Sequence, residues 1–101
     1  MTYLEWLKKE GFELESNTVV ENVNPQWSRP SKYGAPKCAT NNAPIRIVVT
    51  KVDDKFVMSL VAATSDFWSN HEVYDISESF LVKRGRAIEH RLVAAWMEIA
   101  S

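Results

Sequence analysis

The residues that could do covalent or metal chemistry in this chain are few. Cys38 is the only cysteine, and His71 and His90 are the only histidines. Cys38, His71 and Asp75 could act as nucleophile, base and orienting acid, and His71, Glu72 and Asp75 could act as metal ligands. Neither set has a recognised spacing, because the chain contains no His-Glu-x-x-His or Cys-x-x-Cys motif and no glycine-rich phosphate loop. We therefore predict a non-enzymatic protein with no metal or cofactor.

A second kind of chemistry is recognition by aromatic and cationic side chains in the stretch 24–44. This stretch contains all four prolines, which argue against a helix or a central strand and predict a long proline-rich loop. Two aromatic residues alternate with basic ones within it: Trp27, Arg29, Lys32, Tyr33 and Lys37. The rings could stack on nucleic-acid bases or form the hot spot of a protein interface. Alternatively, Trp27 folds back onto the edge of the core while Arg29 and the lysines stay outside.

A further concentration of cations lies near the C-terminus. Lys83, Arg86 and His90 fall on one face of a predicted helix, and Arg84 and Arg91 flank them. Guanidinium groups can bind phosphates or carboxylates with two hydrogen bonds each, so this stripe could hold an anionic partner. Alternatively, it is a solvated outer helix face whose charges pair only within the helix.

Charge is segregated along the chain, although the formal net charge is only −1. The segments 1–21 and 53–78 are acidic, whereas 22–52 and 79–101 are basic. If the two basic segments meet in the fold, they form a positive patch of the kind that an anionic partner needs.

A short helix is predicted at the N-terminus. Thr2 and Glu5 have the spacing of a capping box, in which each residue caps the backbone of the other. The helix is expected to run to about Glu10, and Gly11 is well suited to end it.

The segment 75–99 predicts the long helix around which the rest of the chain is organised. Asp75 and Glu78 have capping-box spacing at its start. Gly85 lies inside it, and we expect one continuous helix in which this glycine permits close contact with the sheet. The alternative is a strand-like 80–82 followed by a helix starting near Gly85. The predicted core face has helical spacing and comprises Leu81, Ile88, Leu92, Ala95, Trp96 and Ile99.

The remaining apolar segments predict strands. Alternation over 12–23 is typical of a strand, and 45–52 and 55–63 form a predicted hairpin around Asp53 and Asp54. The segment 64–76 is ambiguous, with a helical turn over 65–71 and a short edge strand over 72–74. The expected fold is α+β, a small antiparallel sheet of about three strands with a short N-terminal helix and a long C-terminal helix packed on one face.

Length and composition predict one soluble globular domain over 1–101. The chain has 101 residues, of which 46% are hydrophobic and 25% charged. Acidic residues interrupt the N-terminal segment where a signal peptide would be apolar, and no apolar run is long enough to span a membrane. A single cysteine fits a reducing compartment, so we expect a cytoplasmic protein that does not engage a membrane.

The segment Lys83-Arg84-Gly85-Arg86-Ala87, followed by Leu92-Val93-Ala94-Ala95, resembles the second helix of double-stranded-RNA-binding domains. In that family, basic residues at the start of this helix grip phosphates and an alanine-rich face packs inward. The predicted order of elements is also similar, with a helix, three antiparallel strands and a helix. The resemblance implies that fold, and RNA binding as an expectation.

Two function classes follow from these patterns. The first is a small binding module, an inhibitor or accessory protein that masks or bridges a protein partner, of the size that viral or mobile-element genes often encode. The second is a nucleic-acid-binding domain, with Trp27 or Tyr33 stacking on bases. Its phosphate contacts would come from Arg29, Lys32, Lys37, Lys83, Arg84 and Arg86. A cysteine-dependent enzyme is a third class, which a fully active Cys38→Ser variant would exclude.

Overall fold

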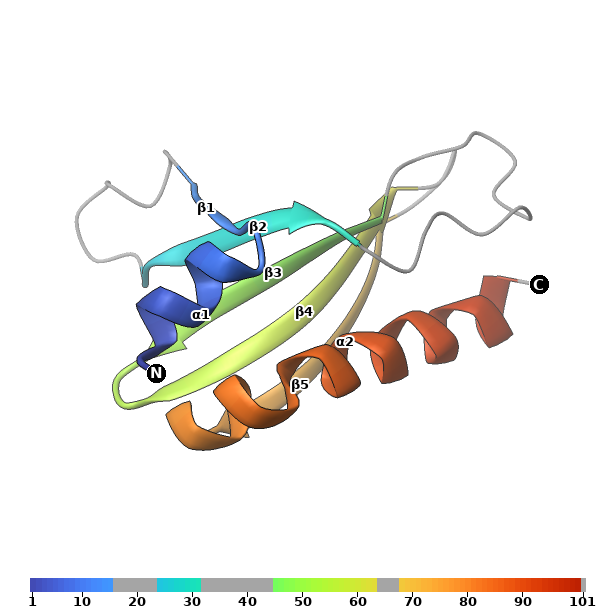
Figure 1. Ribbon diagram of the computed structural model, residues 1–101. Helices are drawn as coiled ribbons and strands as arrows, with labels where there is room; N and C mark the ends of the chain where they lie inside the picture. Colours follow the sequence, from blue (N-terminus) through green and yellow to red (C-terminus); the bar gives the residue numbers. More distant parts are fainter. Residues whose placement is uncertain (16–23, 32–44, 64–67, 101) are drawn as a thin grey trace.

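The computed structural model describes residues 1–15, 24–31, 45–63 and 68–100 (Figure 1). Within these ranges the chain forms two helices and five strands. Their order is α1 (Tyr3–Lys9), β1 (Glu13–Leu14), β2 (Gln26–Pro30), β3 (Ile45–Val52), β4 (Lys55–Ala63), β5 (Trp68–Ile76) and α2 (Glu78–Ala100). The α+β class and the two terminal helices are as predicted.

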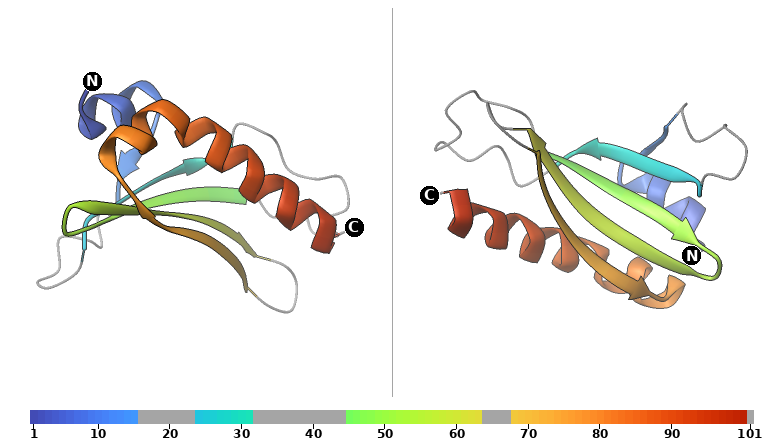
Figure 2. Two further views of the ribbon diagram at one scale, coloured as in Figure 1. Left: turned by 90° about the horizontal axis from the view of Figure 1, so that it is seen from below. Right: turned by 180° about the vertical axis from the view of Figure 1, so that it is seen from behind.

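The described strands form one sheet in the order β1-β2-β3-β4-β5, and every neighbouring pair is antiparallel. Both helices cover the same face of this sheet, α1 over the β2–β3 side and α2 along β4 and β5 (Figures 1 and 2). The predicted hairpin is confirmed, with Val52 paired to Lys55 across the Asp53-Asp54 turn. Asp53 has a φ of 55°, which a two-residue hairpin turn requires at its first central position.

The expected number of about three strands is too low, because β2 was not predicted and β5 was predicted only in part, as the short edge strand 72–74. β2 lies inside the predicted proline-rich loop 24–44, of which 32–44 is outside the described residues. In the antiparallel β2–β3 pair, hydrogen-bonded residue pairs alternate with pairs that make no hydrogen bond, and the bonds from Ser31 N to Ile45 O and from Lys51 N to Pro25 O place Pro30 in a pair of the second kind. The nitrogen of Pro30 therefore faces away from β3, toward the side of β1. Because β1 pairs with β2 only as far as Ser28, no strand needs an N–H from Pro30, and a proline fits there.

β5 replaces the predicted helical turn over 65–71 and extends the predicted short edge strand 72–74 to nine residues. Its pairing with β4 contains an irregularity between Phe56 and Met58, and Asp75 has a φ of 56° at that point. This bulge returns Ile76 to the buried face. Of the strand predicted over 12–23, Glu13 and Leu14 are in β1, and 16–23 is outside the described residues.

The long helix is continuous, as predicted, but it begins at Glu78, later than predicted. Ser77, rather than Asp75, caps it, since its hydroxyl accepts from Phe80 N and its carbonyl from Leu81 N. Gly85 packs against α1 instead of the sheet: a Cβ added there would lie 2.3 Å from Cζ2 of Trp6.

The core fills the space between the helices and the covered face of the sheet. β3 and β4 contribute alternate residues, among them Ile47, Val49 and Met58, all with no exposed surface. Four residues of the predicted core face of α2 are buried, namely Leu81, Ile88, Leu92 and Trp96. Ala95 is exposed, and the side chain of Ile99 is outside the described set.

Candidate functional site

Arg29, predicted to reach a partner from an exposed loop, is instead buried with 5% of its surface exposed. Its Nη1 and Nη2 donate to Oε2 and Oε1 of Glu89 at 2.9 and 2.7 Å, so the pair is bidentate. Nε donates to the backbone oxygen of Glu10 at 2.6 Å, and the guanidinium lies 4.3 Å from the centre of the Phe12 ring. The expectation that Arg29 stays outside is therefore wrong: it joins β2 to α2 and to the end of α1.

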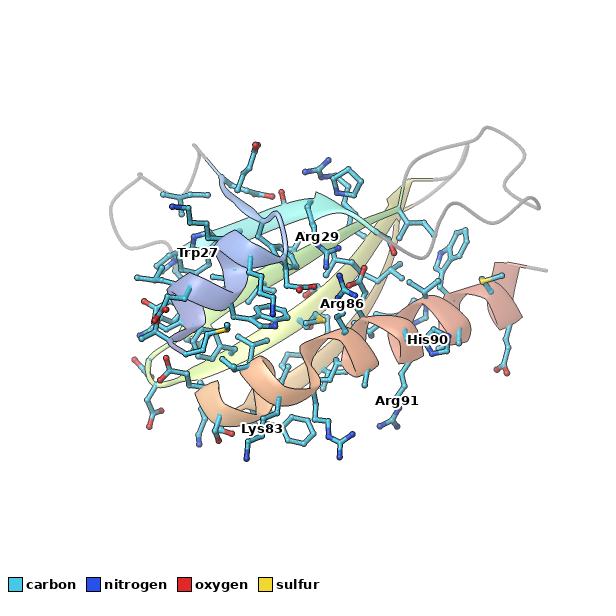
Figure 3. All side chains as sticks on the ribbon, viewed as in Figure 1. Trp27, Arg29, Lys83, Arg86, His90 and Arg91 are labelled. Carbon is cyan, nitrogen blue, oxygen red and sulfur yellow. The ribbon has the colours of Figure 1, made fainter. Side chains whose placement is uncertain are left out.

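Arg86 is drawn into the same network. Its Nε donates to Oε1 of Glu10 at 2.7 Å, and Nη2 of Arg29 lies 3.7 Å from that same oxygen. Glu10 is buried, so its carboxylate is held between two guanidinium groups. In Figure 3, Arg86 points toward Arg29 and away from Arg91. The predicted basic stripe is thus divided by an internal ion pair.

Trp27 follows the alternative prediction and packs onto the edge of the core. It lies in β2, is half-buried, and meets the Tyr3 ring edge-on with the ring centres 5.9 Å apart. Lys32, Tyr33 and Lys37 lie outside the described residues, as does Cys38. Their predicted roles in binding stay predictions.

Four predicted site residues, Lys83, Arg84, His90 and Arg91, are exposed on α2. Lys83 and His90 are seven residues apart and share the outermost face. Arg84 and Arg91 have the same spacing but lie on the flank of α2 that faces β5. The helix therefore presents two separate pairs of cations rather than one stripe.

A groove of about 470 Å³ runs between α2 and β5, along the flank that carries Arg84 and Arg91. Apolar side chains form most of its lining, and the aromatic ring of Phe80 is 51% exposed at its edge. The lining contains the two arginines and no acid: Val73, Phe80, Arg84, Ala87, Ile88, Arg91, Leu92 and Ala95. Neither guanidinium has an acidic or hydrogen-bonding partner within the described part of the chain.

β5 borders this groove and is the outermost strand on its side. Among the residues the structure describes, no strand pairs with its outer edge, whereas its inner edge is paired with β4 from Trp68 to Ile76. The pairing is regular from Trp68 to Val73 and ends at the bulge beside Asp75. An edge of this length offers a row of backbone donors and acceptors to another chain.

The uncovered face of the sheet carries a second hollow, of about 530 Å³. Its lining contains both polar and apolar side chains, and several of the polar ones bond to one another. Arg46 donates to Ser28 at 3.0 Å, and the Tyr74 and Ser59 hydroxyls both donate to Glu72. Glu72 faces this hollow, whereas its neighbour His71 is paired with the buried Leu60 on the other face. The two side chains therefore cannot share a metal ion, and the described residues contain no cluster of three metal-ligating side chains.

Sequence reasoning missed Phe80 and predicted only residues 72–74 of the β5 edge. Phe80 was detectable, because on the helical wheel it lies well away from the Leu81, Ile88 and Leu92 face and so had no predicted place in the core. Glu89 was detectable too, since it lies one turn before the apolar Val93 and so on an inner flank, where an acid requires a cation.

No protein-family model, curated protein or solved structure matches this chain. The resemblance to double-stranded-RNA-binding domains therefore stays a prediction, and the described strands exceed the three that it implied. No helix among the described residues is both long and apolar enough to cross a bilayer.

Proposed function

We propose that this protein is a small non-enzymatic binding module of the cytoplasm that acts as an inhibitor or accessory protein by masking or bridging a protein partner. The proposed contact surface is the side formed by β5 and the neighbouring flank of α2. The observation that carries the proposal is the outer edge of β5, to which no other described strand pairs, beside a groove with the exposed Phe80 ring.

The chemistry of this side suits a protein better than it suits a small molecule. A sheet edge supplies backbone hydrogen bonds along its length, and an aromatic anchor at a pocket is the usual centre of binding energy in protein interfaces. Exposed strand edges also favour unwanted aggregation, which native proteins normally prevent with a bulge, a charge or a cover. Here the bulge comes only at the end of β5, beside Asp75, and leaves the segment up to Val73 open to pairing.

The nucleic-acid alternative receives less support from the same geometry. Of the six cations predicted to contact phosphates, Arg29 is buried against Glu89 and Arg86 is bonded to Glu10. Lys83 and Arg84 remain exposed on α2, and the two loop lysines are outside the described residues. Breaking the buried pair to free Arg29 would leave an uncompensated charge inside the protein.

The test is affinity capture from cell extract with the immobilised full chain and two matched variants. Phe80→Ser removes the groove anchor, and Leu4→Ser removes an equally exposed apolar side chain on α1, with exposures of 51% and 53%. Phe80 borders the groove and Leu4 does not. We therefore expect the Leu4→Ser variant to retain the captured protein and the Phe80→Ser variant to lose most of it. Equal retention by the two variants would refute binding through this side.

A further inference from the structure

We propose that the partner segment recognised at this side is an extended acidic strand, which adds to the outer edge of β5 and places acidic side chains against Arg84 and Arg91. This inference rests on the proposed function and specifies its ligand. It combines three observations on the described residues: a strand edge to which no other described strand pairs, the apolar groove beside it, and two guanidinium groups without an acidic or hydrogen-bonding partner.

The edge determines the conformation of the ligand. From Trp68 to Val73 the backbone of β5 is regularly paired on its inner side, so its outward N–H and C=O groups are aligned for one more antiparallel or parallel strand. An added strand would extend the sheet under the same flank of α2 that now borders the groove. One face of that strand would then meet Phe80, Ala87 and the two arginines.

The lining determines the charge of the ligand. Arg84 and Arg91 are exposed, and the groove lining contains no acid. The two arginines therefore form a local positive field that favours carboxylates and disfavours lysine or arginine side chains. Asp75 lies past the regular part of β5 and is exposed, so the acids of the ligand are expected beside α2 rather than at that end of the strand.

The spacing of the arginines predicts a sequence pattern. Seven residues along a helix correspond to about 10.5 Å. Along a strand, residues i, i+2 and i+4 share one face and span about 13 Å, a distance that two flexible arginine side chains can match. The expected pattern is therefore acid, any residue, apolar, any residue, acid, with the central apolar side chain in the groove.

A second copy of this chain is the obvious competing occupant of the edge. Pairing of β5 with β5 of another copy would bring Arg84 and Arg91 of both copies to the same seam, where like charges repel. The charge of the groove thus favours an acidic strand over self-association.

The test is selection of a displayed library of random ten-residue peptides against the immobilised full chain. We expect enrichment of the acid-x-apolar-x-acid pattern. A variant carrying Arg84→Glu and Arg91→Glu should instead enrich basic residues at the outer positions, whereas Lys83→Glu, an exposed cation outside the groove, should leave the preference unchanged. A synthetic peptide of the enriched sequence should bind the double variant about tenfold more weakly than the natural chain.

The geometry is tested with the same synthetic peptide by amide hydrogen exchange. Backbone amides of β5 should gain protection on binding, and a peptide with N-methylated amides along one edge should not bind. Enrichment without a charge preference, no enrichment, or no protection at β5 would overturn the acidic-strand inference. So would a dimer in sedimentation that the acidic peptide fails to dissociate. If extract capture still depended on Phe80 in any of those cases, the proposed function would stand without this ligand.

Discussion

Arg29 and Glu89 show how a charge predicted to serve recognition can serve the fold. Both side chains are almost fully buried, and the bidentate contact joins β2 to α2. Ser31 adds a hydrogen bond to Glu89 at 3.2 Å, and no buried side-chain polar atom lacks a partner among the described residues. A fully satisfied pair of this kind specifies how β2 and α2 meet.

Replacing Glu89 with glutamine should therefore be strongly destabilising. The Glu89→Gln variant keeps the size of the side chain but removes the bidentate counter-charge of Arg29, leaving only the Glu10 carboxylate at 3.7 Å, so we expect a loss of up to about 3–5 kcal/mol. Urea unfolding followed by circular dichroism measures the loss. Glu98→Gln, at an exposed position on the same helix, is the control and should change stability by less than about 0.5 kcal/mol.

A double variant that removes both charges distinguishes a charge effect from a loss of packing. Arg29→Met combined with Glu89→Leu removes both charges and should recover most of the stability lost in Glu89→Gln. A Glu89→Gln protein as stable as the natural chain would contradict the role given to this pair.

Gly85 of α2 lies directly against the Trp6 ring of α1. Alanine normally stabilises a helix by about 1 kcal/mol relative to glycine. Here the added Cβ would overlap the Trp6 ring, so we expect Gly85→Ala to destabilise the protein by a net of about 1–2 kcal/mol. Thermal unfolding measures the change. In a Trp6→Leu background the same substitution should cost less, and identical costs in the two backgrounds would show that the contact with Trp6 is not the cause.

At the scale of elements, α1 depends on its capping box, which was predicted and is present. Thr2 N donates to Oε1 of Glu5 at 3.1 Å, and Glu5 N donates to the Thr2 hydroxyl at 3.2 Å. The hydrogen bond from the Thr2 backbone, with a second contribution from its side chain, lowers the pKa of Glu5 below its usual value.

This lowered pKa gives α1 a pH dependence of defined sign. A carboxyl with a lower pKa in the folded state contributes stability that is present above its unfolded-state pKa and is lost as the pH falls through its folded-state pKa. Protection factors of amides in α1, corrected for the intrinsic exchange rate, should therefore fall in acid before those in β3 and β4 do. NMR titration of Glu5 checks the shift, and in Thr2→Ala, which removes the side-chain contribution but keeps the backbone donor, its pKa should rise only part of the way toward the ordinary range.

The elements that could be predicted are those with a strong local pattern. The β3–β4 hairpin has nearly continuous apolar strands around a two-residue acidic turn, and both helices have caps and helical spacing. β2 was hidden by prolines, whose tolerance depends on which neighbour each missing N–H would face. β5 was hidden because a polar edge strand such as Ser69-Asn70-His71-Glu72 acquires its structure from pairing with β4 rather than from its own propensity.

The candidate site was predictable only in part. Arg84 and Arg91 were selected from the sequence as flanking cations, and the structure places them together in the groove. The burial of Arg29 could not be predicted from the neighbouring sequence, because its counter-charge, Glu89, is 60 residues away and lies on α2.

At the scale of the whole molecule, the two helices on one sheet face leave the chain with two unlike sides. Arg29 in β2 and Arg86 on α2 are paired with buried acids, whereas Arg84 and Arg91 on the side of β5 have no acidic partner among the described residues. With 12 lysines and arginines against 13 acids and a formal net charge of −1, the chain has no excess of cations to attract a polyanion.

Fluorescence anisotropy with labelled double-stranded RNA and single-stranded DNA should therefore show no saturable binding at physiological salt. Counterion release makes phosphate binding steeply salt-dependent, so the comparison is made at about 50 and about 200 mM salt. Tight binding that collapses at the higher salt and weakens in Lys83→Ala would support the nucleic-acid alternative instead.

The contact between Trp6 and Gly85 also determines when this protein can finish folding. α1 is synthesised before the strands, whereas the surface that covers Trp6 comes from α2, which follows them, and the bond from Tyr3 N to Glu78 Oε2 spans 75 residues. Until α2 has been synthesised, Trp6 lacks the helix against which it packs, and the strands must pair while that face of the sheet is uncovered. Among the described elements, the contact between α1 and α2 therefore forms after the sheet, and a nascent chain stalled before Gly85 would expose apolar side chains to chaperones.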